Sequence, residues 1–161
     1  MSTAETYREL GESAWAWVRA QVRDDDGPWL PAVVPDGAPP TDPAEDRDSL
    51  YAGIAGLAPL LAEIERYRPL ADAEQTLAAA VVERLTAAAA HRVEPSLYDG
   101  LGGDATALRL LAPGHERLVL QRLAALRTPA GWPTTMELGR DTNAPVTDVV
   151  TGTAGVVLAA A

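Results

Sequence analysis

The sequence predicts an all-α protein built from repeated helical hairpins, and three observations lead to this prediction. Ala and Leu dominate the composition, while Phe is absent. Apolar residues recur at helical spacing in six segments of the chain. A short pattern of two glycines three residues apart, GxxG, occurs three times at matched places. We therefore expect six helices in a single domain over residues 1–161, arranged as an α/α toroid or an open solenoid.

The predicted helices follow one another with short and long breaks in alternation. They span residues 3–23, 49–68, 70–92, 96–112, 115–127 and 148–161. The first is amphipathic, and we expect it to bury a stripe made of Tyr7, Leu10, Ala14, Trp17, Val18 and Val22. Residues 24–48 are rich in Pro, Asp and Gly, a composition that disfavours regular structure. Residues 128–147 form a second long loop.

Self-comparison of the sequence gives the repeat. SLYAGIAGLAPLL starts at residue 49, SLYDGLGGDATAL at residue 96 and DVVTGTAGVVLAA at residue 148. The alignment superposes two sets of glycines, which are Gly53, Gly100 and Gly152, and Gly56, Gly103 and Gly155. These GxxG segments are apolar nearly all round, whereas residues 70–92 and 115–127 have one polar side. Each unit is therefore predicted to pair an inner helix with an outer helix.

Two explanations account for the glycines. Residues three apart share a helix face, so each GxxG could form a smooth groove that lets inner helices approach closely. Alternatively, GxxG could form the turn that leads into a helix starting later, which Pro59 near a first helical turn would suit. Both explanations place the three motifs at the same end of the assembly.

That end is the expected functional face. The two long loops lie on it, and long loops on one face of a regular scaffold usually carry function. The amino-terminal ends of the inner helices also meet there, and their free N–H groups favour an anion.

Composition excludes several classes of function. The formal net charge is −10 and the chain has no Lys, so nucleic acid is not an expected partner. No apolar run approaches the ~20 residues of a membrane span, and the first residues do not form a signal peptide. We therefore expect a cytoplasmic protein without a membrane span. The absence of Cys excludes disulfides and thiolate metal ligands in this chain.

Three segments, DRDSLYAGIAGLAPLLAEI, EPSLYDGLGGDATALRLL and TDVVTGTAGVVLAA, resemble the lanthionine synthetase C-like family. The resemblance implies an α/α toroid of which about half the ring is present here as six helices. It implies a zinc-dependent cyclase that adds a cysteine thiol of a peptide to dehydroalanine or dehydrobutyrine, as in lantibiotic biosynthesis. The implied partners are the peptide substrate and a dehydratase.

The family draws its zinc ligands, two Cys and one His, from later hairpins. This chain has no Cys, so we expect no metal site and no cofactor within it, and zinc is implied for the full-length family member alone. The expected identity is an N-terminal fragment that is inactive by itself.

The resemblance places a functional carboxylate near the start of the third inner helix, so Asp148 is the catalytic candidate, as an acid or base. The alternative is plain capping of the helix, in which Asp148 serves as well as the Ser49 and Ser96 of the first two motifs. Substrate-binding candidates are Tyr51 and Tyr98, for which core packing is the alternative, and Trp29 and Trp132 in the long loops, for which loop anchoring is the alternative.

Two other functions fit a helical-hairpin repeat. One is a glycoside-processing α/α toroid in which Asp99 and Asp148 act as acid and base. The other is a non-catalytic helical-repeat scaffold.

Overall fold

The computed structural model describes residues 2–37, 42–43, 46–133 and 146–161. Within these residues there are six α-helices, one short 3-10 helix and a two-stranded antiparallel hairpin. They are, in chain order, α1 (Thr3–Gln21), β1 (Arg23–Asp24), β2 (Pro28–Trp29), η1 (Ile54–Gly56), α2 (Leu57–Tyr67), α3 (Asp72–Ala88), α4 (Leu101–Leu111), α5 (Glu116–Leu126) and α6 (Thr153–Ala160). The prediction of a mostly helical chain with six helices is confirmed for the described residues.

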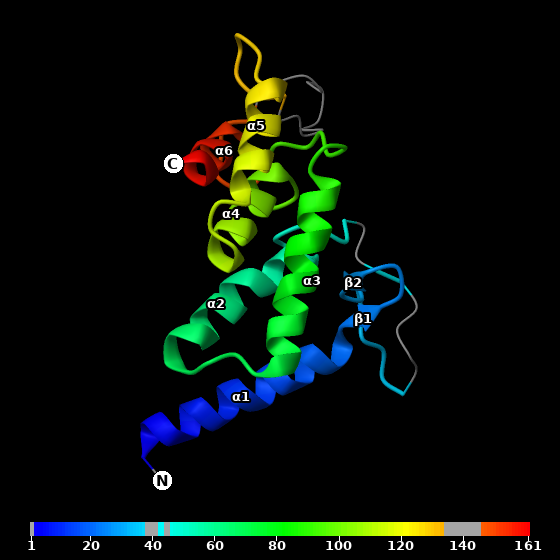
Figure 1. Ribbon diagram of the computed structural model, residues 1–161, viewed down its shortest axis with the longest axis vertical. Coiled ribbons are helices and arrows are strands. Elements are labelled where there is room, and N and C mark those ends of the chain that lie inside the picture. The colour runs from blue at the N-terminus through cyan, green and yellow to red at the C-terminus, as the bar shows by residue number, and fades with distance from the viewer. Residues whose placement is uncertain (1, 38–41, 44–45, 134–145) are drawn as a thin grey trace.

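The helices form an elongated stack in which α4 is central (Figure 1). Helix α1 crosses the lower end, α2 and α3 lie above it, and α5 and α6 lie at the upper end beside α4. Helix α4 packs against α2, α3, α5 and α6. The largest apolar side chains with less than 2% exposure include Ile54, Leu61, Leu85, Leu101, Leu108, Val119 and Val156. The described residues show this stack and no closed ring.

The inner helices begin later than the sequence suggested. Residues 49–53 and 96–100 form turns, and α4 and α6 start directly after Gly100 and Gly152. Gly53 precedes η1, which continues into α2. The side-chain oxygen of Ser49 accepts hydrogen bonds from the N–H groups of Ala52 and Gly53, and such local bonds compete with helix formation. The prediction that these segments are the first turns of helices is wrong, and the turn explanation of GxxG is confirmed for the first glycine of each motif.

The first glycine of each motif is required by its own turn. A Cβ on Gly53 would stand 2.5 Å from the carbonyl oxygen of Arg47, and one on Gly152 would stand 2.5 Å from the nitrogen of Asp148. A Cβ on Gly100 would strike the carbonyl oxygen of Glu94. In each case the obstacle is the backbone that enters the turn, so the expectation that these three glycines let neighbouring inner helices approach closely is wrong.

In the second and third motifs, the second glycine lies close to the preceding repeat, but the contact is with a turn residue and not with an inner helix as the packing explanation had it. A Cβ on Gly103 would lie 2.8 Å from the Cβ of Leu50, in the preceding repeat. A Cβ on Gly155 would lie 2.9 Å from the Cβ of Leu97, again in the preceding repeat. Gly56, in the first motif, meets only the backbone of its own turn. Consecutive repeats therefore approach each other closely at the second glycine.

The predicted stripe of helix α1 is confirmed only at its carboxyl end, where Val18 and Val22 are half-buried against the core. Tyr7, Leu10 and Trp17 are 69%, 64% and 58% exposed, and the buried residue of this helix is Trp15. The indole N–H of Trp15 donates to Glu74 Oε1 at 2.7 Å. The fully buried contact of α1 is therefore an aromatic side chain with a polar partner, which an apolar spacing pattern does not identify.

The first long loop contains more regular structure than its composition suggested. Its start is the β1–β2 hairpin, which turns at Asp26 and Gly27, both with positive φ. The guanidinium of Arg47 donates to carbonyl oxygens of this turn. The second long loop lies mostly outside the described residues.

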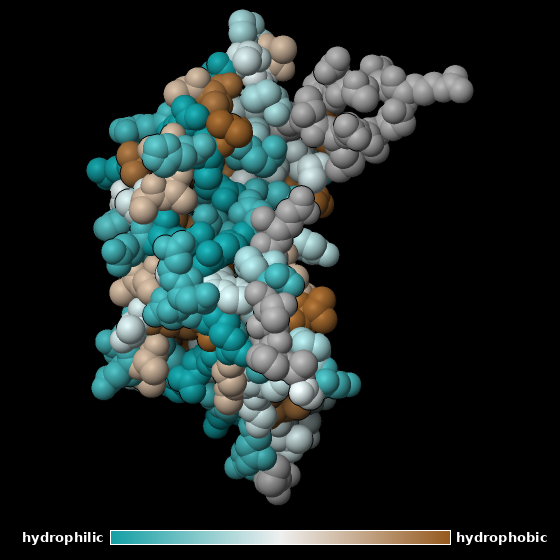
Figure 2. Space-filling model, turned by 90° about the vertical axis from the view of Figure 1, so that its right-hand side faces the viewer, coloured by the Kyte–Doolittle hydropathy of each residue, from teal (hydrophilic) through white to brown (hydrophobic). Residues whose placement is uncertain are grey.

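The molecular surface on the side of the hairpin is largely hydrophilic (Figure 2). Apolar residues appear there in small separate groups. No helix among the described residues is both long and apolar enough to cross a lipid bilayer.

Candidate functional site

The three repeat turns lie side by side and are joined by backbone hydrogen bonds. The N–H of Tyr51 donates to the carbonyl oxygen of Tyr98 at 3.0 Å, and the N–H of Tyr98 donates to that of Val150 at 3.3 Å. These three residues occupy the same position in their repeats. We call the surface formed by residues 49–53, 96–100 and 148–152 the turn face. The prediction that the three motifs share one end of the assembly is confirmed.

Matched side chains stabilise the three turns. Ser49 Oγ accepts from the N–H of Gly53 at 3.1 Å, and Ser96 Oγ accepts from the N–H of Asp99 at 3.4 Å. Asp148 Oδ1 accepts from the N–H groups of Val150 and Thr151 at 2.6 and 3.0 Å. Asp148 therefore caps the third turn as Ser49 and Ser96 cap the first two.

Asp148 is nevertheless the exposed carboxylate of the turn face. Hydrogen bonds from the backbone of Thr151 and Val150 hold the pKa of Asp148 below its ordinary value. The group is therefore ionised at neutral pH. It can accept hydrogen bonds from a ligand, whereas a proton donor would need a raised pKa.

The two repeat tyrosines form an aromatic pair. Their rings are 6.5 Å apart between centroids and nearly perpendicular, at 73°. Tyr51 is 77% exposed, so core packing does not describe it, while Tyr98 is half-buried. The pair presents an aromatic surface on the turn face, in turns bonded to the one that carries Asp148.

Both loop tryptophans have the contacts of anchors. Trp29 is 6% exposed and donates its indole N–H to Asp25. The guanidinium of Arg47 lies over its ring, 5.7 Å from the ring centroid.

Trp132 is half-buried and donates its indole N–H to the carbonyl oxygen of Leu123 at 2.7 Å. Gly131, next to Trp132, lies close to Thr153 at the start of α6. Substrate stacking by either residue stays a prediction.

Sequence reasoning missed a charged cluster behind the turns. Arg92 donates to both oxygens of Asp46, at 2.9 and 2.7 Å, and to the backbone carbonyl of Asp99 at 2.8 Å. Arg84 pairs with Asp48, which also lies 3.8 Å from Arg92. The cluster ties the first turn, the end of α3 and the second turn together. The sequence signal was the pair of aspartates just before the first turn.

Asp104 is the buried member of this cluster. It is fully buried in the first turns of α4, with Oδ2 3.0 Å from Arg92 Nε. Neither oxygen accepts a hydrogen bond from the described residues. Burial raises the pKa of Asp104 to about 8, even though Arg92 acts in the opposite direction. An acidic residue within an otherwise apolar helix was the signal that could have identified it.

The donor set of this chain does not fit the zinc site of the family it resembles. The sequence has no Cys, and within the described ranges no three His, Asp or Glu side chains gather as metal ligands do. We therefore assign no step to a metal held by these residues.

Comparison with family models, curated proteins and solved structures finds no match. The resemblance to the lanthionine synthetase C-like family therefore depends on the quoted segments of the sequence.

Proposed function

We propose that this chain is the N-terminal part of a lanthionine synthetase C-like domain and that its turn face binds a peptide substrate. In this proposal the repeat continues beyond the described hairpins into a toroid. The chain itself supplies binding and orientation, because its donors do not fit a zinc-thiolate site.

The observation that carries the proposal is the ladder that joins the turns. Tyr51, Tyr98 and Val150 are bonded in sequence, so matched positions of successive repeats face the same side. An exposed carboxylate stands at one end of this row and an aromatic pair at the other. A peptide can donate backbone N–H groups to the carboxylate of Asp148 and can place apolar side chains against the pair of Tyr51 and Tyr98.

Asp148 is assigned the role of a hydrogen-bond acceptor that orients the peptide. A free thiol has a pKa of about 8.5, far above that of this carboxylate, so Asp148 is a poor acceptor for a thiol proton. Its two oxygens are held by the turn in a fixed direction. These contacts suit the positioning of a peptide by Asp148 better than acid–base catalysis.

The test starts from the gene sequence downstream of this chain. A Cys followed by a Cys-His pair in later hairpins supports the cyclase, whereas further carboxylates and tryptophans support the glycoside-processing alternative. The extended protein is then assayed for thioether formation on a dehydrated, cysteine-containing peptide.

In that protein, Asp148→Asn is expected to lower kcat/KM about 10- to 100-fold, the range for loss of a hydrogen bond to a charged group. Its melting temperature should be unchanged, because Asn caps about as well as Asp. The matched control is Asp99→Asn on the neighbouring turn, which should keep its activity. Unchanged turnover of Asp148→Asn would refute the assigned role, and loss of saccharide hydrolysis in both variants would favour the glycoside-processing alternative.

A further inference from the structure

We infer that α1 pairs with α1 of a second copy in a weak, antiparallel homodimer. The observation is an apolar stripe of Tyr7, Leu10, Ala14 and Trp17 on this helix, all exposed. Their spacing of three, four and three residues places them on one face. The inference is independent of the proposed function, because it uses no residue of the turn face.

The stripe is complementary to itself when one copy is reversed. In an antiparallel pair centred at the level of residue 12, Tyr7 stands opposite Trp17 of the second copy and Leu10 stands opposite Ala14. At the centre, Leu10 of each copy thus meets the smaller Ala14 of the other. At each end, Tyr7 of one copy meets Trp17 of the other. This arrangement has the two-fold symmetry that an isologous dimer requires.

The positions beside the stripe carry no charge. They are Thr6, Gly11, Ser13, Val18 and Ala20. In coiled-coil pairs, charges at such flanking positions decide which partners are attracted or repelled. A chain with a formal net charge of −10 therefore presents to its copy a strip that lacks repelling groups.

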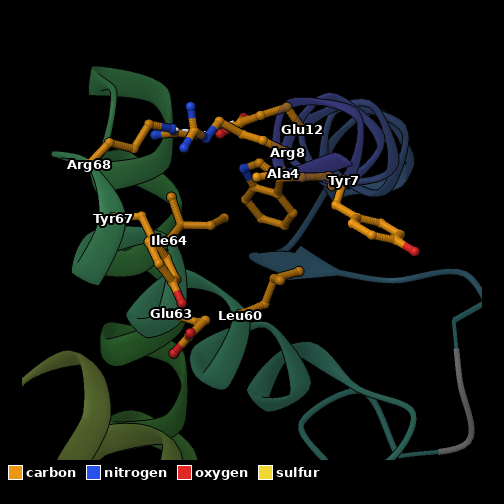
Figure 3. Close-up of a pocket in the computed structure, with 11 residues that line it drawn as sticks. Ala4, Tyr7, Arg8, Glu12, Leu60, Glu63, Ile64, Tyr67 and Arg68 are labelled. Atoms are coloured by element: carbon orange, nitrogen blue, oxygen red, sulfur yellow. Dashed lines mark hydrogen bonds and ion pairs between the residues drawn. The ribbon is translucent and has the colours of Figure 1, made fainter. Parts of the chain in front are cut away.

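Helix α1 also lies where a partner can reach it. It crosses the end of the stack, and its amino-terminal half extends beyond the body (Figure 1). A groove of about 820 Å³ separates this half from α2, with Tyr7 and Tyr67 on its two sides (Figure 3). Leu60 and Ile64 line the groove floor. A Trp17 side chain from the second copy, placed opposite Tyr7, would lie at the mouth of this groove, whose lining combines apolar side chains with the charged Arg8, Glu12, Glu63 and Arg68.

The buried area sets the expected strength. An aromatic side chain buries roughly 150–250 Å², so the exposed parts of the stripe amount to roughly 400 Å² per copy. A stable interface usually buries about 800 Å² per partner. We therefore expect a dimer that forms at micromolar or higher concentration and that strengthens with salt, because salt screens the repulsion between two acidic copies.

Sedimentation velocity of the 161-residue chain over a range of protein and NaCl concentrations tests this inference. Leu10→Ser should weaken self-association at least tenfold, and Ala14→Glu should abolish it. The matched control is Leu158→Ser on α6, a leucine 60% exposed against 64% for Leu10, which should change it less than twofold. Circular dichroism checks that each variant is folded.

The orientation is tested with a spin label on Thr3→Cys, which is the single thiol in a chain without Cys. An antiparallel pair separates the two labels by about 27 Å along the helix axis, at about 1.5 Å per residue, whereas a parallel pair brings them side by side. A monomer at all concentrations, association lost in Leu158→Ser instead of Leu10→Ser, or a short label distance would each overturn the inference.

Discussion

The place for a Cβ on Gly155 lies 2.9 Å from the Cβ of Leu97, and Gly103 meets Leu50 in the same way at 2.8 Å. Two successive pairs of repeats therefore share one contact, at residues that the sequence alignment matches. Since the backbone ladder joins the same repeats, the contact fixes their relative height as well as their separation. This register requires glycine at positions 103 and 155, because a side chain there would strike the leucine of the preceding repeat.

Gly155→Ala is expected to lower the free energy of unfolding by about 2 kcal/mol, in the range typical of overpacking. The added methyl group would strike Leu97 and the carbonyl oxygen of Val149, and this effect opposes the roughly 1 kcal/mol by which Ala favours a helix over Gly. Urea denaturation measures the change. Gly11→Ala is the control: nothing lies within 4 Å of its Cβ position, so it should stabilise the chain. Equal effects of the two substitutions would remove the contact argument.

The sequence alone predicted the helices and the repeat. It did not predict the residues at which the inner helices start. Periodicity predicted the helices, and alignment of GxxG correctly placed the three motifs at one end of the assembly. The helix starts were missed because Ser49 and Ser96 bond to nearby N–H groups, a local effect that apolar spacing does not contain. The face of α1 that is buried depends on the hydrogen bond between Trp15 and Glu74, which are distant in sequence.

The candidate site was predictable in part for the same reason. Tyr51 and Tyr98 became candidates because they occupy matched repeat positions, and Asp148 because the family resemblance implies a carboxylate near the start of the third inner helix. Their exposure was not predictable, since it depends on how the turns stack. Asp104 and Arg92 were missed because their partnership joins two repeats through a buried contact between residues that no periodic pattern relates.

Glu74 is expected to stabilise the attachment of α1 in a pH-dependent way. Arg68 donates to both of its oxygens, at 2.7 and 2.9 Å, and these bonds, with that from Trp15, lower the pKa of Glu74 to about 2. The folded pKa lies below the ordinary value of 4.5, so this stability is present above pH 4.5 and is lost as the pH falls toward 2. Glu74→Gln should cost about 3 kcal/mol at pH 7 and little at pH 2.

Urea denaturation at pH 7 and at low pH measures this difference. Glu63→Gln is the control, because its pair with Arg66 is exposed and such pairs contribute about 0–1 kcal/mol. A loss for Glu74→Gln that is equal at both pH values would show that shape, and not charge, holds α1.

Asp104 is expected to give the free energy of unfolding a pH dependence opposite to that given by Glu74. Its pKa rises from 3.8 to about 8 on folding, so between these values the folded chain binds more protons than the unfolded chain. Stability should therefore fall as the pH rises from about 4 to about 8. Asp104→Asn keeps the shape of the side chain without the charge, and should flatten this decline. Thermal melts between pH 5 and pH 8.5 measure it, and a variant that follows the pH dependence of the parent would show that Asp104 stays ionised beside Arg92.

Trp29 and Tyr51 are expected to respond in opposite ways to removal of the side chain. Trp29 is 6% exposed and bonded to Asp25, so Trp29→Ala should cost about 3–5 kcal/mol, and Trp29→Phe about 1 kcal/mol for the lost hydrogen bond. Tyr51 is 77% exposed, so Tyr51→Ala should change stability by less than about 0.5 kcal/mol. Urea denaturation of the three variants gives these values. This contrast separates an anchor of the first long loop from a side chain free to meet a ligand, because only the second can be removed without loss of stability. A small loss of stability for Trp29→Ala would show that Trp29 is not an anchor and would favour its role as a substrate-binding residue.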